Sequence, residues 1–135
     1  MWRSIRAIVI GFVTIAVLSF AADAVLHSLV PHRFDAEGAM ESVPLLLLVI
    51  LYVGVFAVAG CYVTARLAPR RPMWHALALG GLGLVFNVAG TFARWNDAPV
   101  WYHVLSVGLV MPYAWLGGYI RERELLRSPP AAAIG

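Results

Sequence analysis

The sequence predicts an all-α membrane protein in which four transmembrane helices form an up-down-up-down bundle. One observation is the presence of four apolar segments, each close to the 20 residues that a helix needs to cross a hydrocarbon core of roughly 30 Å. Another is the composition, since 61% of the 135 residues are hydrophobic and 13% are charged, whereas soluble chains carry about 25% charged residues. The segments and their turns use almost the whole chain, which predicts a single four-span domain over residues 1–127.

The first predicted helix covers about residues 7–30 and the second about residues 43–65. Residues 1–6 are positively charged, as in a secretory signal, but the apolar run that follows is longer than the 7–15 or so residues of such a signal. A retained first helix is therefore predicted. Pro31 ends it, and Pro44 suits the first turn of the second helix, because proline lacks the amide hydrogen that a helix interior requires.

The third predicted helix covers about residues 73–93 and the fourth about residues 100–120. A short turn flanked by prolines, residues 69–72, precedes the third helix, and Pro99 opens the fourth. Such short connections make helices that are adjacent in sequence pack antiparallel. Residues 128–135 contain two prolines and three alanines, and we expect them to form a disordered tail.

The arginines predict the orientation of the bundle. Eight of the ten basic residues lie at one predicted end: Arg3, Arg6, Arg66, Arg70, Arg71, Arg121, Arg123 and Arg127. Cytoplasmic loops of membrane proteins carry an excess of such residues, so both termini are expected in the cytoplasm. No part of the sequence resembles an address for an organelle, so a bacterial inner membrane is the expected location. Basic groups at helix ends meet lipid headgroups, which makes the bilayer the expected partner and argues against a nucleic acid.

Polar and small residues recur at helical spacing along the four segments, and they predict a polar pocket near the outer end of the bundle. Its candidate residues are Asp23, His27, Asn87, Thr91, Arg94 and His103. A charged carboxylate at the depth of Asp23 costs up to about 2.5–3.5 kcal/mol, so it should be neutral or paired, with Arg94 and His27 within reach. Gly80 and Gly83 are expected to approach a neighbouring helix.

Three interpretations of this pocket stay open. The first is a polar link that fixes the packing of the helices. The second is a proton- or ligand-responsive site built on Asp23 and His27. The third is a metal or haem site that uses His27, His32 and His103. The sequence carries no motif of a metalloprotease, a serine hydrolase or a phosphate-binding loop. We therefore expect no catalytic residue, no metal ligand and no cofactor.

Several runs of the sequence resemble a group of small bacterial membrane proteins. They are GCYVTARLAPRRPMWHA at residues 60–76, PVWYH at residues 99–103, AWLGG at residues 114–118 and DAVLH at residues 23–27. The resemblance covers nearly the whole chain. It implies a four-helix inner-membrane protein and carries over no activity and no catalytic residue.

The expected function is that of a non-enzymatic subunit or scaffold in the membrane. The alternative is a small transporter or channel with a proton- or ligand-responsive pocket in the outer leaflet. Four spans do not easily enclose a pathway alone, so the alternative requires self-association. The expected protein partners are accordingly further copies of the chain or a larger membrane complex.

Overall fold

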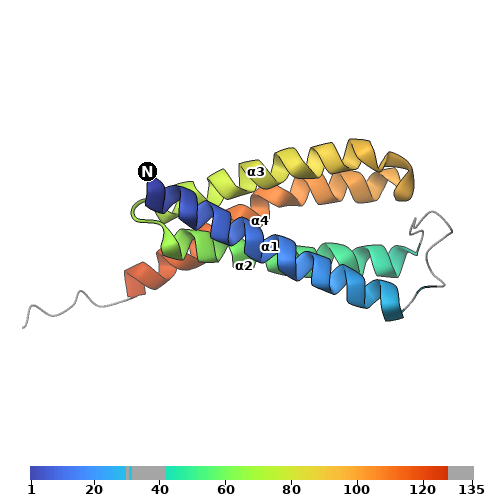
Figure 1. Cartoon of the computed structure of the whole chain (residues 1–135), viewed down its shortest axis with the longest axis horizontal. Helices are drawn as coiled ribbons and strands as arrows, with labels where there is room; N and C mark the ends of the chain where they lie inside the picture. Colours follow the sequence, from blue (N-terminus) through green and yellow to red (C-terminus); the bar gives the residue numbers. More distant parts are fainter. Residues whose placement is uncertain (30, 32–41, 128–135) are drawn as a thin grey trace, which may run out of the picture.

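Figure 1 shows the computed structural model, which describes residues 1–29, 31 and 42–127. The described residues form four α-helices and one short 3-10 helix: α1 (Trp2–Leu29), α2 (Val43–Leu67), α3 (Pro72–Ala93), η2 (Trp95–Asp97) and α4 (Val100–Arg127). The predicted all-α class is confirmed, and each of the four α-helices is long and apolar enough to cross a membrane. The tail predicted for residues 128–135 lies outside the described residues.

The helices extend beyond the predicted apolar segments. α1 begins at Trp2 rather than residue 7, α2 ends at Leu67 rather than residue 65, and α4 continues to Arg127 rather than ending at residue 120. Hydrophobicity marks only the part of a helix that suits hydrocarbon, whereas backbone hydrogen bonds continue until a breaker stops them. The charged ends of α1 and α4 are therefore helical too.

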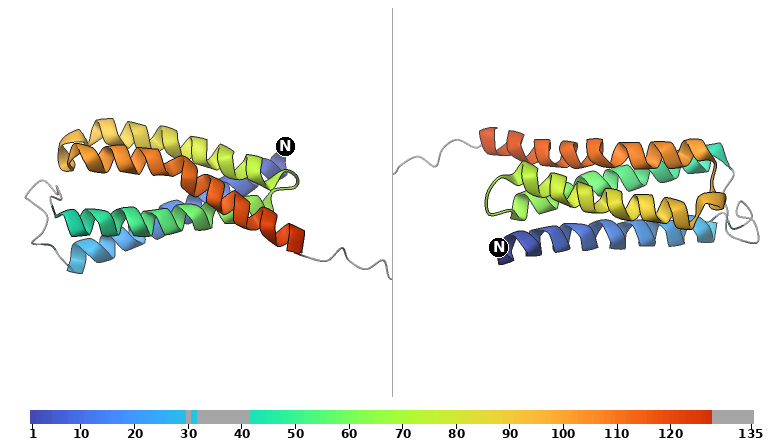
Figure 2. Two further views of the ribbon diagram at one scale, coloured as in Figure 1. Left: turned by 180° about the vertical axis from the view of Figure 1, so that it is seen from behind. Right: turned by 90° about the horizontal axis from the view of Figure 1, so that it is seen from above.

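The four helices form two hairpins that lie side by side. The start of α1 and the connection between α2 and α3 lie at one end of the structure, and the connection between α3 and α4 lies at the other (Figures 1 and 2). α1 packs mainly on α2, and α4 packs on both α2 and α3. The hairpins are closest near the start of α1 and separate towards the α3–α4 connection.

The half of the bundle near the start of α1 is closely packed, and its interior is built mainly from small residues. The buried residues there are Ala7, Cys61, Thr64, Ala65, Ala76, Leu79 and Ala114. Small side chains let helix backbones approach one another, which is how helices associate where lipid removes the hydrophobic driving force. The Thr64 hydroxyl also donates a hydrogen bond to the Ala7 carbonyl oxygen, 3.2 Å away, and so links α2 to α1.

Two glycines expected at a helix contact behave differently. Gly80 is buried against Ala114 of α4, so the expectation for Gly80 is confirmed. A β-carbon added at Gly83 would have Val110 Cγ1 as its nearest neighbour, at 3.8 Å, which is an ordinary contact distance. The expected close approach at Gly83 is therefore wrong: the two hairpins have already begun to separate at this level, and Gly83 faces the space between them.

Candidate functional site

A cavity of about 580 Å³ lies between the two hairpins in the half of the bundle where they separate. It reaches from Cys61, Leu79 and Gly80 in the packed middle of the structure to Asp23 and Arg94 near the ends of α1 and α3. Pockets for small molecules have volumes of roughly 300–1,000 Å³. The cavity is therefore large enough for a small ligand.

The deep part of the cavity is mainly apolar, with Tyr113 of α4 as its polar member. It is lined by Ile15 of α1, Ala57 of α2, Leu79 of α3, and Leu109 and Val110 of α4. The wall that α2 contributes continues outward through Val53, Ile50, Val49 and Leu46. A hydrocarbon group would meet matching surface along this whole wall.

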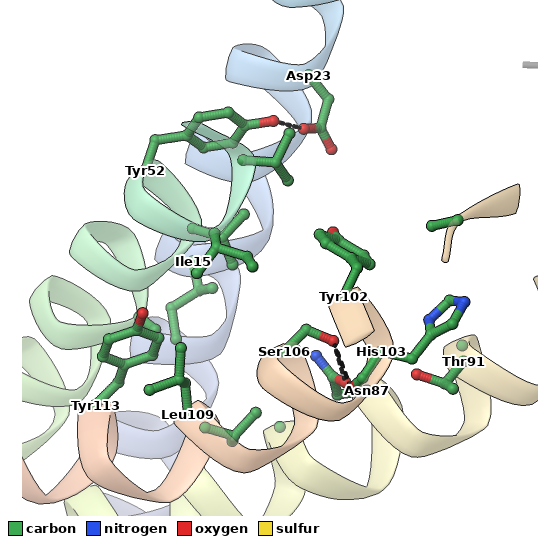
Figure 3. A pocket seen from close by; sticks show the side chains of 18 of the residues that line it. Ile15, Asp23, Tyr52, Asn87, Thr91, Tyr102, His103, Ser106, Leu109 and Tyr113 are labelled. Carbon is green, nitrogen blue, oxygen red and sulfur yellow. Dashed lines mark hydrogen bonds between the residues drawn. The ribbon is translucent and has the colours of Figure 1, made fainter. Parts of the chain in front are cut away.

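All six predicted pocket residues line this one cavity: Asp23, His27, Asn87, Thr91, Arg94 and His103. They come from α1, from the end of α3 and from the start of α4, and they occupy the half of the cavity nearer the α3–α4 connection. In Figure 3, Asp23 lies on one side of the cavity, and Asn87 and Thr91 lie on the opposite side. That these residues bind a ligand stays a prediction.

Asp23 is paired, but not with Arg94, which is one of its two predicted partners. The hydroxyl of Tyr52 on α2 donates a hydrogen bond to Oδ1 of Asp23, which joins α1 to α2 at the rim of the cavity (Figure 3). Arg94 instead forms an ion pair with Asp97, with Nε 2.7 Å from Oδ2. The predicted Asp23–Arg94 pair is therefore wrong, because α3 ends at Ala93 and the turn that follows brings Asp97 back onto Arg94.

Sequence reasoning missed Tyr52. It stands in a long apolar run, where a tyrosine is as easily a membrane-interface or core residue as a hydrogen-bond donor. The position of Asp23 on α1 does signal that a partner is needed. Which helix supplies that partner is set by the packing of α1 on α2, and this the sequence does not state.

His103 packs against the turn between α3 and α4 and stabilises it. Its ring stacks on that of Trp95 with centroids 5.2 Å apart, and its Nε2 lies 3.2 Å from the Trp95 carbonyl oxygen. A carbonyl oxygen only accepts, so Nε2 carries the proton in this contact. The side chain is 6% exposed, which suits a residue that holds the start of α4 in place.

The proposed metal site gains no support from the described residues, because no three histidine, cysteine, aspartate or glutamate side chains among them are grouped to hold a metal ion. His103 uses one ring nitrogen on the Trp95 carbonyl, and His32 lies outside the described part of the chain.

Several polar groups of the cavity wall are free to meet a ligand. The amide nitrogen of Asn87, the hydroxyl of Thr91 and the hydroxyl of Tyr102 all belong to lining residues, and none donates a hydrogen bond to a described residue. Ser106 Oγ donates to the His103 carbonyl oxygen at 3.2 Å and lies 3.5 Å from Oδ1 of Asn87. The cavity thus combines a mainly apolar interior with donors nearer its outer end that no described residue engages.

Comparison of the chain with protein-family models, with curated proteins and with solved structures finds no match.

Proposed function

We propose that this chain is a bacterial inner-membrane protein that binds an amphiphilic small molecule in the cavity and catalyses no reaction itself. The observation that carries the proposal is the combination of an apolar interior with free hydrogen-bond donors in one space of about 580 Å³. The apolar part of the ligand lies against Ile15, Val53 and Val110. Its polar end reaches Asn87 and Thr91.

Binding suits the geometry better than conduction through a single chain. Between Cys61 and Leu79 and the end where α1 begins, the helices are packed closely through small residues. The cavity therefore does not continue to that end of the bundle. A small oligomeric transporter is the second candidate, and the open half of the bundle favours it. That role also requires the packed half to open. A chain that binds a ligand can also be a subunit of a larger membrane complex. The many exposed apolar side chains on its outer surface support that role.

In this proposal the helices cross the membrane alternately, with both termini in the cytoplasm and the cavity towards the outer face. The distribution of arginines supports this orientation. A reporter active only in the cytoplasm, fused to either end of the chain, is expected to give signal at both ends. Signal from one end alone would rule out four crossings.

Filling the cavity is expected to abolish binding. Gly83→Leu adds a side chain where the nearest neighbour of a β-carbon is 3.8 Å away, so the variant should fold with its new side chain in the cavity. Gly81→Leu is the matched control, because it makes the same change on the same helix at a position with no neighbour within 4 Å and outside the cavity lining. Both changes remove a helical glycine and raise helix propensity alike.

Thermal unfolding in nanodiscs, with a series of alkyl amphiphiles of different chain length and headgroup, measures the effect. A ligand present at 100 times its dissociation constant stabilises a folded protein by about 2.7 kcal/mol. We expect stabilisation of the natural chain and of Gly81→Leu by at least one amphiphile of the series, and none of Gly83→Leu. Equal stabilisation of all three chains would exclude the cavity as the binding site.

A further inference from the structure

A second cavity lies at the other end of the bundle, where α1 begins. Its volume is about 250 Å³, and its lining consists of Arg3, Arg6, Ala7 and Ile10 of α1, Leu67 at the end of α2, and Pro69 of the following connection. Residues three apart on a helix share a face. The two arginines therefore border the same space, and both are exposed.

The charges of Arg3 and Arg6 are not neutralised within the described part of the chain. Neither residue forms an ion pair or a side-chain hydrogen bond with a described residue. Glu124, on the charged end of α4 beyond residue 120, is engaged elsewhere: it accepts a hydrogen bond from the Tyr62 hydroxyl at 2.9 Å and pairs with Arg121 at 3.0 Å. These two contacts lower the pKa of Glu124 and keep its carboxylate charged.

The start of α1 adds further positive character. The unpaired amides at the N-terminus of a helix carry a partial positive charge, which favours an anion near the first turn. None of the acidic residues in the described part of the chain lines the cavity. Two guanidinium groups near such a terminus are suited to a phosphate, which arginine binds through paired hydrogen bonds.

Apolar surface continues from this cavity along α1. Ile10 is 42% exposed, and Val13 and Val17, which follow it on the same side of the helix, are 50% and 60% exposed. A soluble phosphate has no apolar part to place against this strip, whereas a lipid bound by its headgroup at the start of α1 would lay its acyl chains along it. We propose that the cavity binds the phosphate headgroup of an acidic phospholipid whose acyl chains run along Ile10, Val13 and Val17. Basic pockets beside transmembrane helices are suited to such headgroups.

The test is native mass spectrometry of the full chain released from nanodiscs that contain phosphatidylglycerol and phosphatidylcholine. The natural chain is expected to retain phosphatidylglycerol preferentially. The double variant Arg3→Gln with Arg6→Gln should bind it more weakly, by roughly tenfold for each arginine removed. Arg70→Gln with Arg127→Gln is the matched control, since it removes the same charge from the same end outside the cavity. Arg71 is not used in this control, because its φ of 49° lies in the left-handed backbone region that favours glycine.

A second variant separates lipid binding from membrane insertion, which also depends on basic residues at this end. Ile5→Arg with Arg6→Gln keeps the net charge of the first turns but moves one guanidinium group out of the cavity lining. We expect roughly tenfold weaker retention. Retention at the level of the natural chain, or an equal loss in the Arg70 and Arg127 control, would overturn the proposal in favour of diffuse surface charge.

Glycerol 3-phosphate provides the remaining arm of the test, since it carries the phosphate without acyl chains. Added in excess, it is expected to leave the retained phosphatidylglycerol in place. Displacement of the lipid by glycerol 3-phosphate would assign the cavity to a soluble phosphate instead. The outcome does not depend on the cavity between the hairpins, because the two cavities share no residue.

Discussion

Gly117→Ala is expected to destabilise the bundle by about 1–3 kcal/mol or more, the usual effect of inserting a methyl group where there is no room. A β-carbon at this position would stand 2.7 Å from the Val58 carbonyl oxygen and 2.9 Å from the Tyr62 amide nitrogen of α2. Both are backbone atoms, so no side chain can rotate away to relieve the contact. α4 would have to move away from α2. Thermal unfolding of the purified protein in detergent measures the loss.

Gly108→Ala is the control on the same helix. A β-carbon there has no neighbour within 4 Å, and alanine is a better helix former than glycine by roughly 0.5–1 kcal/mol. The control should therefore unfold at the same temperature as the natural chain or higher. If both alanine variants were as stable as the natural protein, α2 and α4 would not pack at Gly117 as described.

Removing the carboxylate of Asp23 or the hydroxyl of Tyr52 is expected to lower stability, and the two effects should not add. Residues that share a hydrogen bond show interaction energies of about 0.5–3 kcal/mol in double-mutant cycles. Asp23→Ala and Tyr52→Phe each leave the other partner with an unmet hydrogen bond at the rim of the cavity. The double variant should then lose less stability than the sum of the two single losses. Titration with a denaturing detergent gives the unfolding free energies of the natural chain, the two single variants and the double variant.

The cycle of Asp23→Ala with Arg94→Ala is the natural comparison. Arg94 pairs with Asp97, so these two losses should add to within about 0.5 kcal/mol, as for independent sites. Coupling between Asp23 and Arg94, together with additive losses for Asp23 and Tyr52, would reverse the assignment of partners. It would also restore Arg94 as one of the two partners that the sequence predicts for Asp23.

The helices were predictable because membrane-spanning segments carry a strong signal in hydrophobicity alone. Their ends were not, as Arg127 shows: the last two turns of α4 are charged and remain helical. That polar residues of the apolar segments would line a common space was predictable for a related reason. A polar side chain such as Asn87 or Asp23 within an apolar segment is costly towards lipid, so it is expected to turn towards the other helices, and both residues line the cavity.

The partners and the cavity were not predictable from the sequence. Tyr52 and Asp97 became the partners of Asp23 and Arg94 through the angle at which α1 crosses α2 and through the turn after α3. The cavity itself arises because small residues hold the hairpins together at one end only. Gly80 and Gly83 have the same chemistry three residues apart, yet one lies in the packed half and the other in the open half.

The central claim is that the cavity between the hairpins holds an amphiphile, and mass spectrometry of an organic extract tests it most directly. The natural chain, Gly81→Leu and Gly83→Leu would be purified from native membranes in a mild detergent and extracted in parallel. We expect an amphiphile in stoichiometric amount from the natural chain and from Gly81→Leu, and its loss from Gly83→Leu. An acidic phospholipid held at Arg3 and Arg6 should appear in all three extracts and so serve as an internal standard. Identical extracts from the natural chain and Gly83→Leu would contradict the claim.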